Sequence, residues 1–472
     1  LEHGIRYSQH LAASDIRKVG EQQSITSLCN KLRRNIIHHV FNTDISAEAQ
    51  SFVVATLLGN SKLITPETRA EFSAAGISHI LALSGLHVGI ILVMVWFLLY
   101  PLDYMGWRRL RLVITLVLML CYAFFTGLSP SVVRATVMAS VGVTGLLFYR
   151  KSVSINALGT AALILLAFNP YALFNPGFQL SFVTVASLLM FYNKPVNMPR
   201  KTKQSGKFRS WFMALASTSA IALISTLMLS AWYFNSFSLQ SLISNLVIIP
   251  LFPVLMFLSV IFLMLSCCDI QMDIINPLVD GLYNVISSIA KFTGQSLPGH
   301  IDNIYVTGVD VMLYYAALGC LLLWIHNKRF MWANMAVLLV TLIFANGIYL
   351  QATTPSSGFV VFNNYSHTQV FSFTDGKGTL WTPNGEADVE EFKTYNKAFL
   401  AHYNIDSISS IEGKECAVLG GRRIVCAGSE SNKAKDSVST KIDVDYLIIT
   451  KKYHKDIEKL CKVYQPRKVI LS

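Results

Sequence analysis

Two histidines and a serine stand at the start of the first long apolar stretch of the sequence, HILALSGLHVGI at residues 79–90. Imidazole and hydroxyl groups donate and accept hydrogen bonds, and histidine exchanges protons near neutral pH. Ser84 and His87 are three residues apart, so a helix brings them onto one face. Together with His79, this polar face either lines an aqueous path or satisfies its own hydrogen bonds at a membrane surface, and the sequence leaves both interpretations open.

Three more polar residues interrupt later apolar runs. Arg134 lies in SPSVVRATVMAS, where its side chain either extends to the lipid headgroups or points inward and attracts an anion. Gln179 in NPGFQLSF and Asn245 in SLISNLVIIP carry amides, which usually join neighbouring helices and less often line a pathway. The candidates for a transport path are therefore His79, Ser84, His87, Arg134, Gln179 and Asn245.

The familiar motifs of catalysis do not occur in the sequence. It contains no GxxxxGK[ST] phosphate loop, no HExxH and no HxHxDH, and the tail histidines His367, His402 and His454 are far apart. We therefore expect no catalytic residue, no metal site and no cofactor. Cys416 and Cys426 are placed to bridge a hairpin in an oxidising compartment, and the sequence leaves open whether they pair.

The composition indicates what kind of scaffold positions these residues. Hydrophobic residues make up 53% of the 472 and charged residues only 14%, and the mean hydropathy is +0.47. An average soluble domain has about 25% charged residues, so this composition excludes an ordinary soluble enzyme and a disordered chain. Most of the net charge of +12 falls in residues 79–350, which hold 15 basic and 6 acidic residues. The sequence therefore predicts a polytopic α-helical membrane protein.

Apolar runs long enough to cross a bilayer recur throughout this central section. The stretch 273–294 is a further amphipathic helix that either spans or lies in the interface, so we expect about 8–10 spans in total. Gly85 and Gly89 form a small-xxx-small pair that favours close helix packing. The candidate spans are 79–101, 110–127, 131–149, 153–169, 177–193, 211–234, 241–267, 311–327 and 330–350.

Local signals predict where several helices begin, end or break. Ser46 is expected to cap a helix that runs to Gly59, and Thr65–Pro66 to open another, with proline at the first helical position. Pro250 and Pro253 free two backbone carbonyls within one apolar run, which a lipid-facing helix does not tolerate alone. That run is therefore expected to be broken or re-entrant.

Basic residues indicate the orientation of the membrane section. Thirteen of its 15 lie in the loops after the first, third and fifth predicted spans and between the last two. The positive-inside rule places these loops in the cytoplasm, so the N-terminal part and the tail lie outside it. The number of membrane crossings agrees with this orientation only if 241–267 is re-entrant or forms a pair of spans with 273–294.

The tail alternates like strands in GFVVFN, QVFSF, GTLWT, ECAVLGG, RRIVCAG, DYLIIT and KVILS. Helical stretches are expected near 388–400 and 454–464. The tail is thus predicted to be a small, truncated α/β soluble domain. Because the chain starts at Leu1 and finishes on a strand-like run, we expect an internal piece of a longer protein.

The stretch FVVATLLGNSKLITPETRAEFSAAGISHILALSGLHVGI resembles the opening of the ComEC competence domain, with its GxxHxLAxSGLHV signature. SVVRATVMAS, NPGFQLSF and SNLVIIPLFP follow in the order and roughly the spacing of that family's later motifs. The resemblance covers about residues 45–350. It implies a multi-pass channel in the bacterial inner membrane through which single-stranded DNA enters the cytoplasm during natural transformation.

The resemblance also implies a domain organisation and partners. Residues 1–45 would be the trailing end of an extracytoplasmic N-terminal domain, 46–350 the competence transmembrane domain, and 356–472 a degenerate, truncated metallo-β-lactamase-like domain. DYLIITKKYHKDIEKLCKVYQPRKVILS is similar to a strand–helix–strand unit of that domain, although the metal-ligand motif is missing. The implied partners are single-stranded DNA, membrane lipid, a DNA receptor, a cytoplasmic helicase-like motor, a separate nuclease and a second copy of the chain in a homo-oligomer.

Two other classes of function compete with the channel. A secondary transporter of a small anionic solute would use the broken run 241–267 as its site, and an inverted repeat would favour it. A membrane-anchored, metal-dependent nuclease or hydrolase would need metal ligands in the tail, which the sequence lacks.

Overall fold

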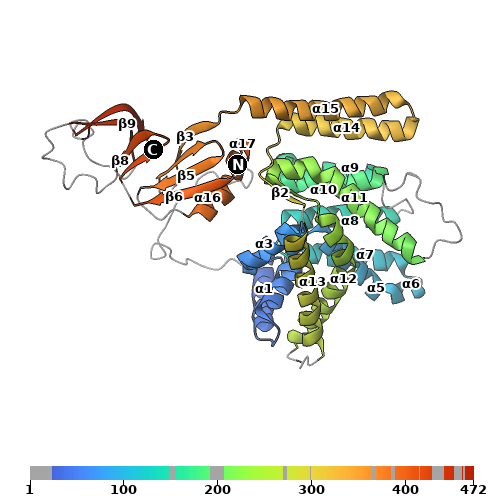
Figure 1. The fold of residues 1–472 in the computed structure, drawn as a ribbon. Coiled ribbons are helices and arrows are strands. Elements are labelled where there is room, and N and C mark those ends of the chain that lie inside the picture. Colours follow the sequence, from blue (N-terminus) through green and yellow to red (C-terminus); the bar gives the residue numbers. More distant parts are fainter. Residues whose placement is uncertain are drawn as a thin grey trace. The chain divides into compact units, whose positions relative to one another are not determined.

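Helices dominate the part of the chain that the structure describes (Figure 1). The structure is a computed structural model, and two units within it are each described by themselves: Leu1–Tyr233 with Phe237–Ile301, and Phe234–Ser236 with Asp302–Ser472. The described residues are 24–147, 155–191, 207–268, 270, 274–297, 299–363, 368–383, 388–413, 415–427, 441–450, 460 and 463–471.

The first unit is built from α-helices joined by short turns and two 3-10 helices. The α-helices are α1 (Ile25–Phe41), α2 (Ala47–Leu58), α3 (Pro66–Ala74), α4 (Ser78–Leu81), α5 (Gly85–Leu98), α6 (Tyr100–Tyr104), α7 (Arg108–Phe125), α8 (Pro130–Leu147), α9 (Ile155–Phe168), α10 (Pro176–Phe191), α11 (Lys207–Phe234), α12 (Ser241–Ser266) and α13 (Ile275–Ser296). The 3-10 helices are η2 (Ser61–Leu63) and η3 (Pro170–Phe174).

Five of the described helices are long and apolar enough to cross a membrane. They are α8, α11 from Phe208, and α12, followed in the second unit by α14 (Gly308–Asn327) and α15 (Phe330–Thr353). Helices α2, α5, α9 and α10 are apolar but shorter. The predicted fold class, a polytopic helical membrane protein with a small α/β domain at its C-terminal end, is confirmed.

The predicted helix starts near the N-terminus are confirmed. The side chain of Ser46 caps α2 by accepting from the Ala49 amide, and Gly59 ends the helix with φ of 76°. Thr65 caps α3 in the same way, with proline at the first helical position. Both signals are local, although Ser46 also makes a tertiary contact by donating from its amide and hydroxyl to Asp280 of α13.

The first predicted span, 79–101, is not one helix. The chain leaves the helical conformation between α4 and α5, where Ala82 and Ser84 are extended, and α5 begins at Gly85. Ser84 is therefore a helix cap and not a residue on the face of a continuous helix. The physical reason is that a serine hydroxyl satisfies free amides at a helix start more readily than it tolerates a helix interior.

Helix α12 corrects the expectation of a break at Pro250 and Pro253. It is one continuous α-helix of 26 residues that contains both prolines. A proline inside a helix costs about 3 kcal/mol, and here packing offsets that cost, since Ile248, Phe252 and Leu255 are buried. Neighbouring protein thus covers one face of the helix beside the carbonyls that lack partners, whereas Val247 and Val254 of the same turns are exposed.

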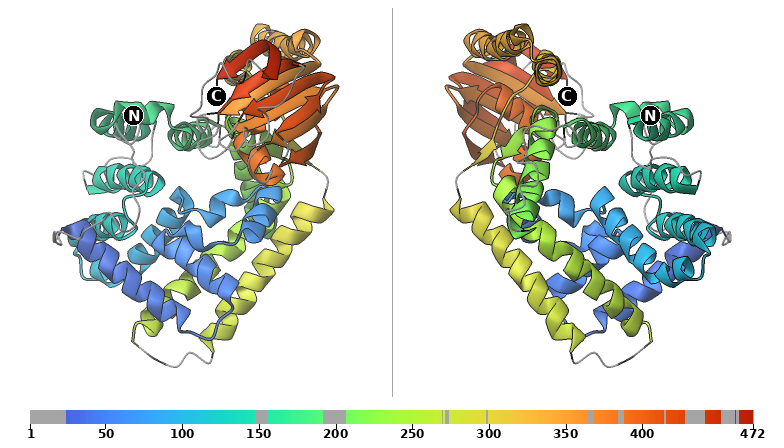
Figure 2. Two further views of the ribbon diagram at one scale, coloured as in Figure 1. Left: turned by 90° about the vertical axis from the view of Figure 1, so that its left-hand side faces the viewer. Right: turned by 90° about the vertical axis from the view of Figure 1, so that its right-hand side faces the viewer.

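The core of the first unit joins helices that are far apart in sequence. Phe52 of α2 contacts Phe72 of α3, Phe252 of α12 and Tyr283 of α13, with ring centroids 6.1, 6.4 and 5.2 Å away. Helices α12 and α13 follow each other as a hairpin, shown in yellow-green and yellow (Figure 2). This core fixes the position of α2–α5 against α12.

The second unit contains a helical hairpin and a two-sheet domain. Helices α14 and α15 lie side by side (Figure 1). In one sheet β3 (Ser357–Asn363), β4 (Thr368–Thr374) and β5 (Lys377–Thr382) are antiparallel neighbours, and β6 (Ser407–Glu412) joins β5 in parallel. In the other, β7 (Cys416–Leu419) pairs antiparallel with β8 (Arg422–Ala427), and β9 (Ile442–Ile449) and β10 (Tyr464–Leu471) follow in parallel. The remaining described elements are the short strands β1 (Ser236–Ser238) and β2 (His300–Asp302), which pair, and the helices α16 (Val389–Tyr395) and α17 (Lys397–His402).

The two larger sheets enclose an apolar layer. Val370 and Trp381 from one sheet pack with Ile424, Cys426 and Ile448 from the other. The first sheet buries its opposite face against α16 and α17. The predicted α/β tail is therefore confirmed, whereas the expected helix at 454–464 lies largely outside the described residues.

The two hairpin cysteines do not face each other. Cys416 lies opposite Val425 across the β7–β8 pair, so Cys426 is one residue out of register. Successive side chains of a strand point to opposite faces, and accordingly Cys416 is exposed whereas Cys426 is buried between the sheets. In the part of the chain that the structure describes, the two cysteines form no disulfide with each other.

Alkylation is expected to distinguish these two cysteines by their reactivity. Burial, with smaller effects of Glu415 and Cys416, raises the pKa of the Cys426 thiol to about 12. Only the thiolate attacks an alkylating reagent, so Cys426 in the folded chain stays unmodified from neutral pH to about pH 10. Iodoacetamide labelling read by peptide mass spectrometry should show Cys416 modified first and Cys426 modified only after denaturation. Equal labelling of both in the folded chain would contradict the register.

Candidate functional site

Ser84 and His87 close a reciprocal cap at the start of α5. The Ser84 hydroxyl lies 2.9 Å from Nδ1 of His87, and the Ser84 amide donates to the same nitrogen at 3.2 Å. Since Nδ1 accepts from an amide, a neutral ring carries its proton on Nε2. His87 is fully buried, with its ring centroid 4.9 Å from that of Phe252 on α12. The pair therefore fixes the start of α5 against α12.

Arg134 lies in the second turn of α8 and is buried. Only 8% of the residue is exposed, and its Nε has no hydrogen-bond partner among the described residues. Its guanidinium group lies against Gly177, the second residue of α10: a Cβ atom built on that glycine would be 2.9 Å from Nη2 and 3.5 Å from Cζ. The structure thus brings Arg134 to the N-terminal end of a neighbouring helix.

The other candidate residues lie in different surroundings. Gln179 donates to the Leu173 carbonyl at 3.0 Å and accepts from the Tyr233 hydroxyl at 3.1 Å, so its amide joins α10 to α11. Asn245, in the second turn of α12, is half-buried, and its Oδ1 has no partner in the described part of the chain. His79 of α4 is exposed.

Helices α5 and α8 begin at the same end of the unit. The hydroxyl of Ser131, in the first turn of α8, donates to the carbonyl of Leu83, just before α5, at 2.6 Å. A Cβ atom on Gly85 would lie 3.8 Å from Cβ of Ala135, whereas one on Gly89 would meet no described atom within 4 Å. Of the predicted packing glycines, only Gly85 therefore lies where two helices approach.

The N-terminal ends of α5 and α10 thus each lie against the N-terminal part of α8. The aligned peptide dipoles of a helix give each helix start a partial positive charge. With the guanidinium of Arg134 added, this end of the helices is electropositive. It is suited to attract an anion.

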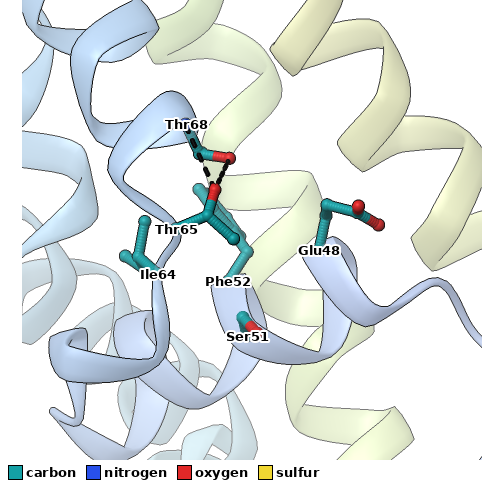
Figure 3. A pocket seen from close by; sticks show the side chains of 6 residues that line it. All are labelled: Glu48, Ser51, Phe52, Ile64, Thr65 and Thr68. Atoms are coloured by element: carbon teal, nitrogen blue, oxygen red, sulfur yellow. Dashed lines mark hydrogen bonds between the residues drawn. The ribbon is translucent and has the colours of Figure 1, made fainter.

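Two cavities among the described residues of the first unit are not polar paths. One of about 230 Å³ lies between α5, α8, α9 and α10, is lined almost entirely by aliphatic side chains, and contains none of the six candidate residues. The other, between α2 and α3, measures about 10 Å³, which is room for one water molecule at most. Figure 3 shows Thr65 and Thr68 bonded to each other at its edge.

In the residues that the structure describes, no three histidine, cysteine, aspartate or glutamate side chains gather as metal ligands would. His402 is half-buried, with its ring centroid 4.4 Å from that of Tyr305. His367 and His454 lie outside the described residues.

Comparison with known proteins identifies the family. The model of the family described as competence protein matches residues 56–328, more than half of the chain. The chain belongs to the competence protein family. A second family model, the ComEC C-terminal domain, matches residues 359–472. The resemblance that the sequence motifs indicated is therefore confirmed.

The chain matches two relatives over part of their length. It is 30% identical to ComE operon protein 3 of Bacillus subtilis (strain 168) over 251 residues, which is 52% of the chain and 30% of the relative. It is also 30% identical to an uncharacterized protein of Aquifex aeolicus (strain VF5) over 179 residues, 37% of the chain and 40% of that protein. The matches thus span well under half of either relative. No solved structure matches the chain.

The sequence does not single out two residues that matter at this end of the helices, Gly177 and Phe252. Gly177 leaves the space that the guanidinium of Arg134 fills, and Phe252 packs against His87. The glycine was visible in NPGFQLSF, where proline and glycine precede a polar residue at a helix start. Nothing in the sequence pairs Phe252 with His87, because that contact joins segments far apart in the chain.

Proposed function

We propose that this competence protein carries single-stranded DNA across the inner (cytoplasmic) membrane during DNA uptake. The observation that carries the proposal is the competence family match to residues 56–328, which runs from α2 to the end of α14 and so includes most of the span-capable helices. The electropositive helix ends near Arg134 support it, since a phosphate chain needs cationic and polar groups to offset desolvation in a membrane.

The orientation and partners belong to the same proposal. The basic loops lie in the cytoplasm, and both the N-terminal part and the tail lie outside it, where incoming DNA is met. Incoming single-stranded DNA, a DNA receptor, a helicase-like motor in the cytoplasm and a separate nuclease complete the process, with membrane lipid around the chain and a homo-oligomer as its assembly. The candidate path residues remain those that the sequence indicated, with Arg134 the one whose surroundings fit an anion best.

Deletion and complementation test this proposal. Cells lacking the gene should take up no labelled DNA into the cytoplasm and give no transformants, whereas growth on small anionic solutes stays unchanged. Restoring the full-length protein should restore both DNA readouts. Normal transformation in the deleted strain would overturn the channel, and a growth defect restricted to one anionic solute would favour the secondary transporter. That alternative requires a broken helix at 241–267, whereas α12 is continuous.

We also propose that the C-terminal domain is degenerate, with a structural or DNA-guiding role, and does not cut DNA, because the sequence contains no HxHxDH motif. The full chain incubated with single-stranded and double-stranded DNA and added Mn²⁺, Mg²⁺ or Zn²⁺ should leave both substrates intact. Metal-dependent cleavage that co-purifies with the chain and disappears when residues 356–472 are deleted would contradict this prediction.

A further inference from the structure

We propose that Arg134 and the first turn of α10 form a binding site for one phosphodiester group of single-stranded DNA. The proposal rests on the proposed function for the identity of the DNA, but the requirement for an anion comes from the structure alone. No other described residue of the membrane section combines a buried cation, a missing counter-charge and a helix start.

The first argument is the missing counter-charge. Arg134 is more than nine-tenths buried, and no carboxylate of the described residues lies within ion-pair distance of it. An arginine side chain stays protonated in proteins, and an unpaired buried charge is strongly unfavourable. Arg111 shows the contrast, because that buried arginine pairs with Asp103 and donates to the Trp96 carbonyl. A bound anion would give Arg134 the negative counter-charge that Asp103 gives Arg111.

The second argument is the surroundings of the guanidinium group. It lies at the start of α10, a helix of 16 residues whose N-terminal end carries partial positive charge. A cation alone at that position is repelled, whereas an anion between the two is attracted by both. Asn175 accepts from the Gly177 amide at 2.9 Å, so this cap organises the first turn.

The third argument is the glycine. A Cβ atom on Gly177 would lie 2.9 Å from Nη2 of Arg134 and 3.1 Å from Oδ1 of Asn175. Such a contact displaces the guanidinium, because its flexible end moves more easily than the backbone. Glycine at this position therefore keeps the guanidinium within reach of the helix start.

The geometry favours a phosphodiester over a larger anion. There is one cation, which matches the single negative charge of a phosphodiester, and arginine donates to two phosphate oxygens at once. A single such contact holds a strand weakly enough for it to move on, as conduction requires. A lipid headgroup carries the same phosphodiester chemistry, so the experiment must separate the two sources.

Salt-dependent binding of a labelled oligothymidylate to the full chain in phosphatidylcholine nanodiscs tests the site. The variants Arg134→Gln and Gly177→Ala should each weaken binding about tenfold, and Arg134→Gln should lower the slope of log K against log salt by about 0.7, the value for one phosphate of a single strand. Arg69→Gln is the matched control, because the exposed Arg69 donates only to the Ser61 carbonyl. Unchanged affinity and slope in Arg134→Gln would overturn the proposal.

Two further measurements exclude other roles of Arg134. Without oligonucleotide, Arg134→Gln should unfold at a temperature no lower than the wild type, since it removes an unpaired buried charge. A lower unfolding temperature in both the presence and absence of oligonucleotide would show a structural arginine and overturn the site. If phosphatidylglycerol in the nanodisc stabilises the wild type but not Arg134→Gln, and oligonucleotide affinity is unaffected by the variant, the anion is a lipid and the proposal fails.

The two proposals fail separately. Transformation that persists in cells carrying Arg134→Gln, with unchanged oligonucleotide binding, removes this site and leaves the channel intact. Oligonucleotide binding that depends on Arg134, in a chain whose deletion does not impair DNA uptake, removes the channel and leaves the phosphodiester site.

Discussion

The Gly76→Ala variant is expected to lose about 3 kcal/mol or more of folding stability in the first unit. Gly76 has φ of +73°, which side chains other than glycine rarely adopt. A Cβ atom there would lie 2.6 Å from Cβ of Ser241, the first residue of α12, and 2.9 Å from Cβ of Ser238, the last residue of β1. The full chain in detergent should therefore unfold at a clearly lower temperature and accumulate to a lower level.

Two matched glycines separate the causes of this loss. Gly106 also has positive φ, +79°, but a Cβ atom on it would meet no described atom within 4 Å. Gly106→Ala should therefore show the backbone cost alone, about 1–2 kcal/mol. Gly89 lies inside α5 with open space around it, so Gly89→Ala should be neutral or stabilise by about 0.5–1 kcal/mol. If Gly76→Ala behaves like Gly106→Ala, the close approach to α12 is not what limits this position.

Helix-capping residues in the sequence correctly predicted the ends of the helices that they cap. The sequence predicts caps at Ser46 and Thr65 and a helix end at Gly59, and the structure confirms them, because each is set by residues within one turn. The interruption before α5 was missed because apolar periodicity runs through it, although Ser84 and His87 stand at the spacing of a capping box. Strand β6 was also missed, since SISSIE has few apolar residues and forms through its pairing with β5.

Tertiary surroundings decided what the sequence left open. Arg134 had two interpretations, lipid headgroups or an inward anion, and the inward position next to Gly177 is visible only in the fold. Gln179 and Asn245 look alike in sequence, yet Gln179 bonds between helices while Oδ1 of Asn245 has no partner in the described chain. Residue type thus indicates which groups are unusual in a membrane, whereas neighbouring helices determine whether they are satisfied.

The second large effect is expected at Asp310, where α14 meets α15. Its Oδ2 accepts from the amide and hydroxyl of Thr307 at 2.9 and 2.7 Å, and its Oδ1 accepts from Asn346 at 2.9 Å. Only 6% of Asp310 is exposed, so Asp310→Ala leaves three donors without that acceptor. Since an unsatisfied buried polar group costs about 1–3 kcal/mol, the variant should lose about 3 kcal/mol and loosen the helical hairpin.

A double-mutant cycle tests whether the contact between the two helices carries this loss. Asn346→Ala alone should cost less than Asp310→Ala, because Thr307 still caps α14 with Asp310. The double variant should be more stable than the sum of the single losses predicts, by about 1 kcal/mol, since either change removes the bond between Asp310 and Asn346. Thr341→Val on α15 is the control: its hydroxyl bonds only within its own helix, to the Val337 carbonyl, and the change should stay within about 0.5 kcal/mol. Strict additivity in thermal or denaturant unfolding would mean that Asp310 acts only as a cap of α14 and that its bond to Asn346 adds nothing to the stability of the hairpin.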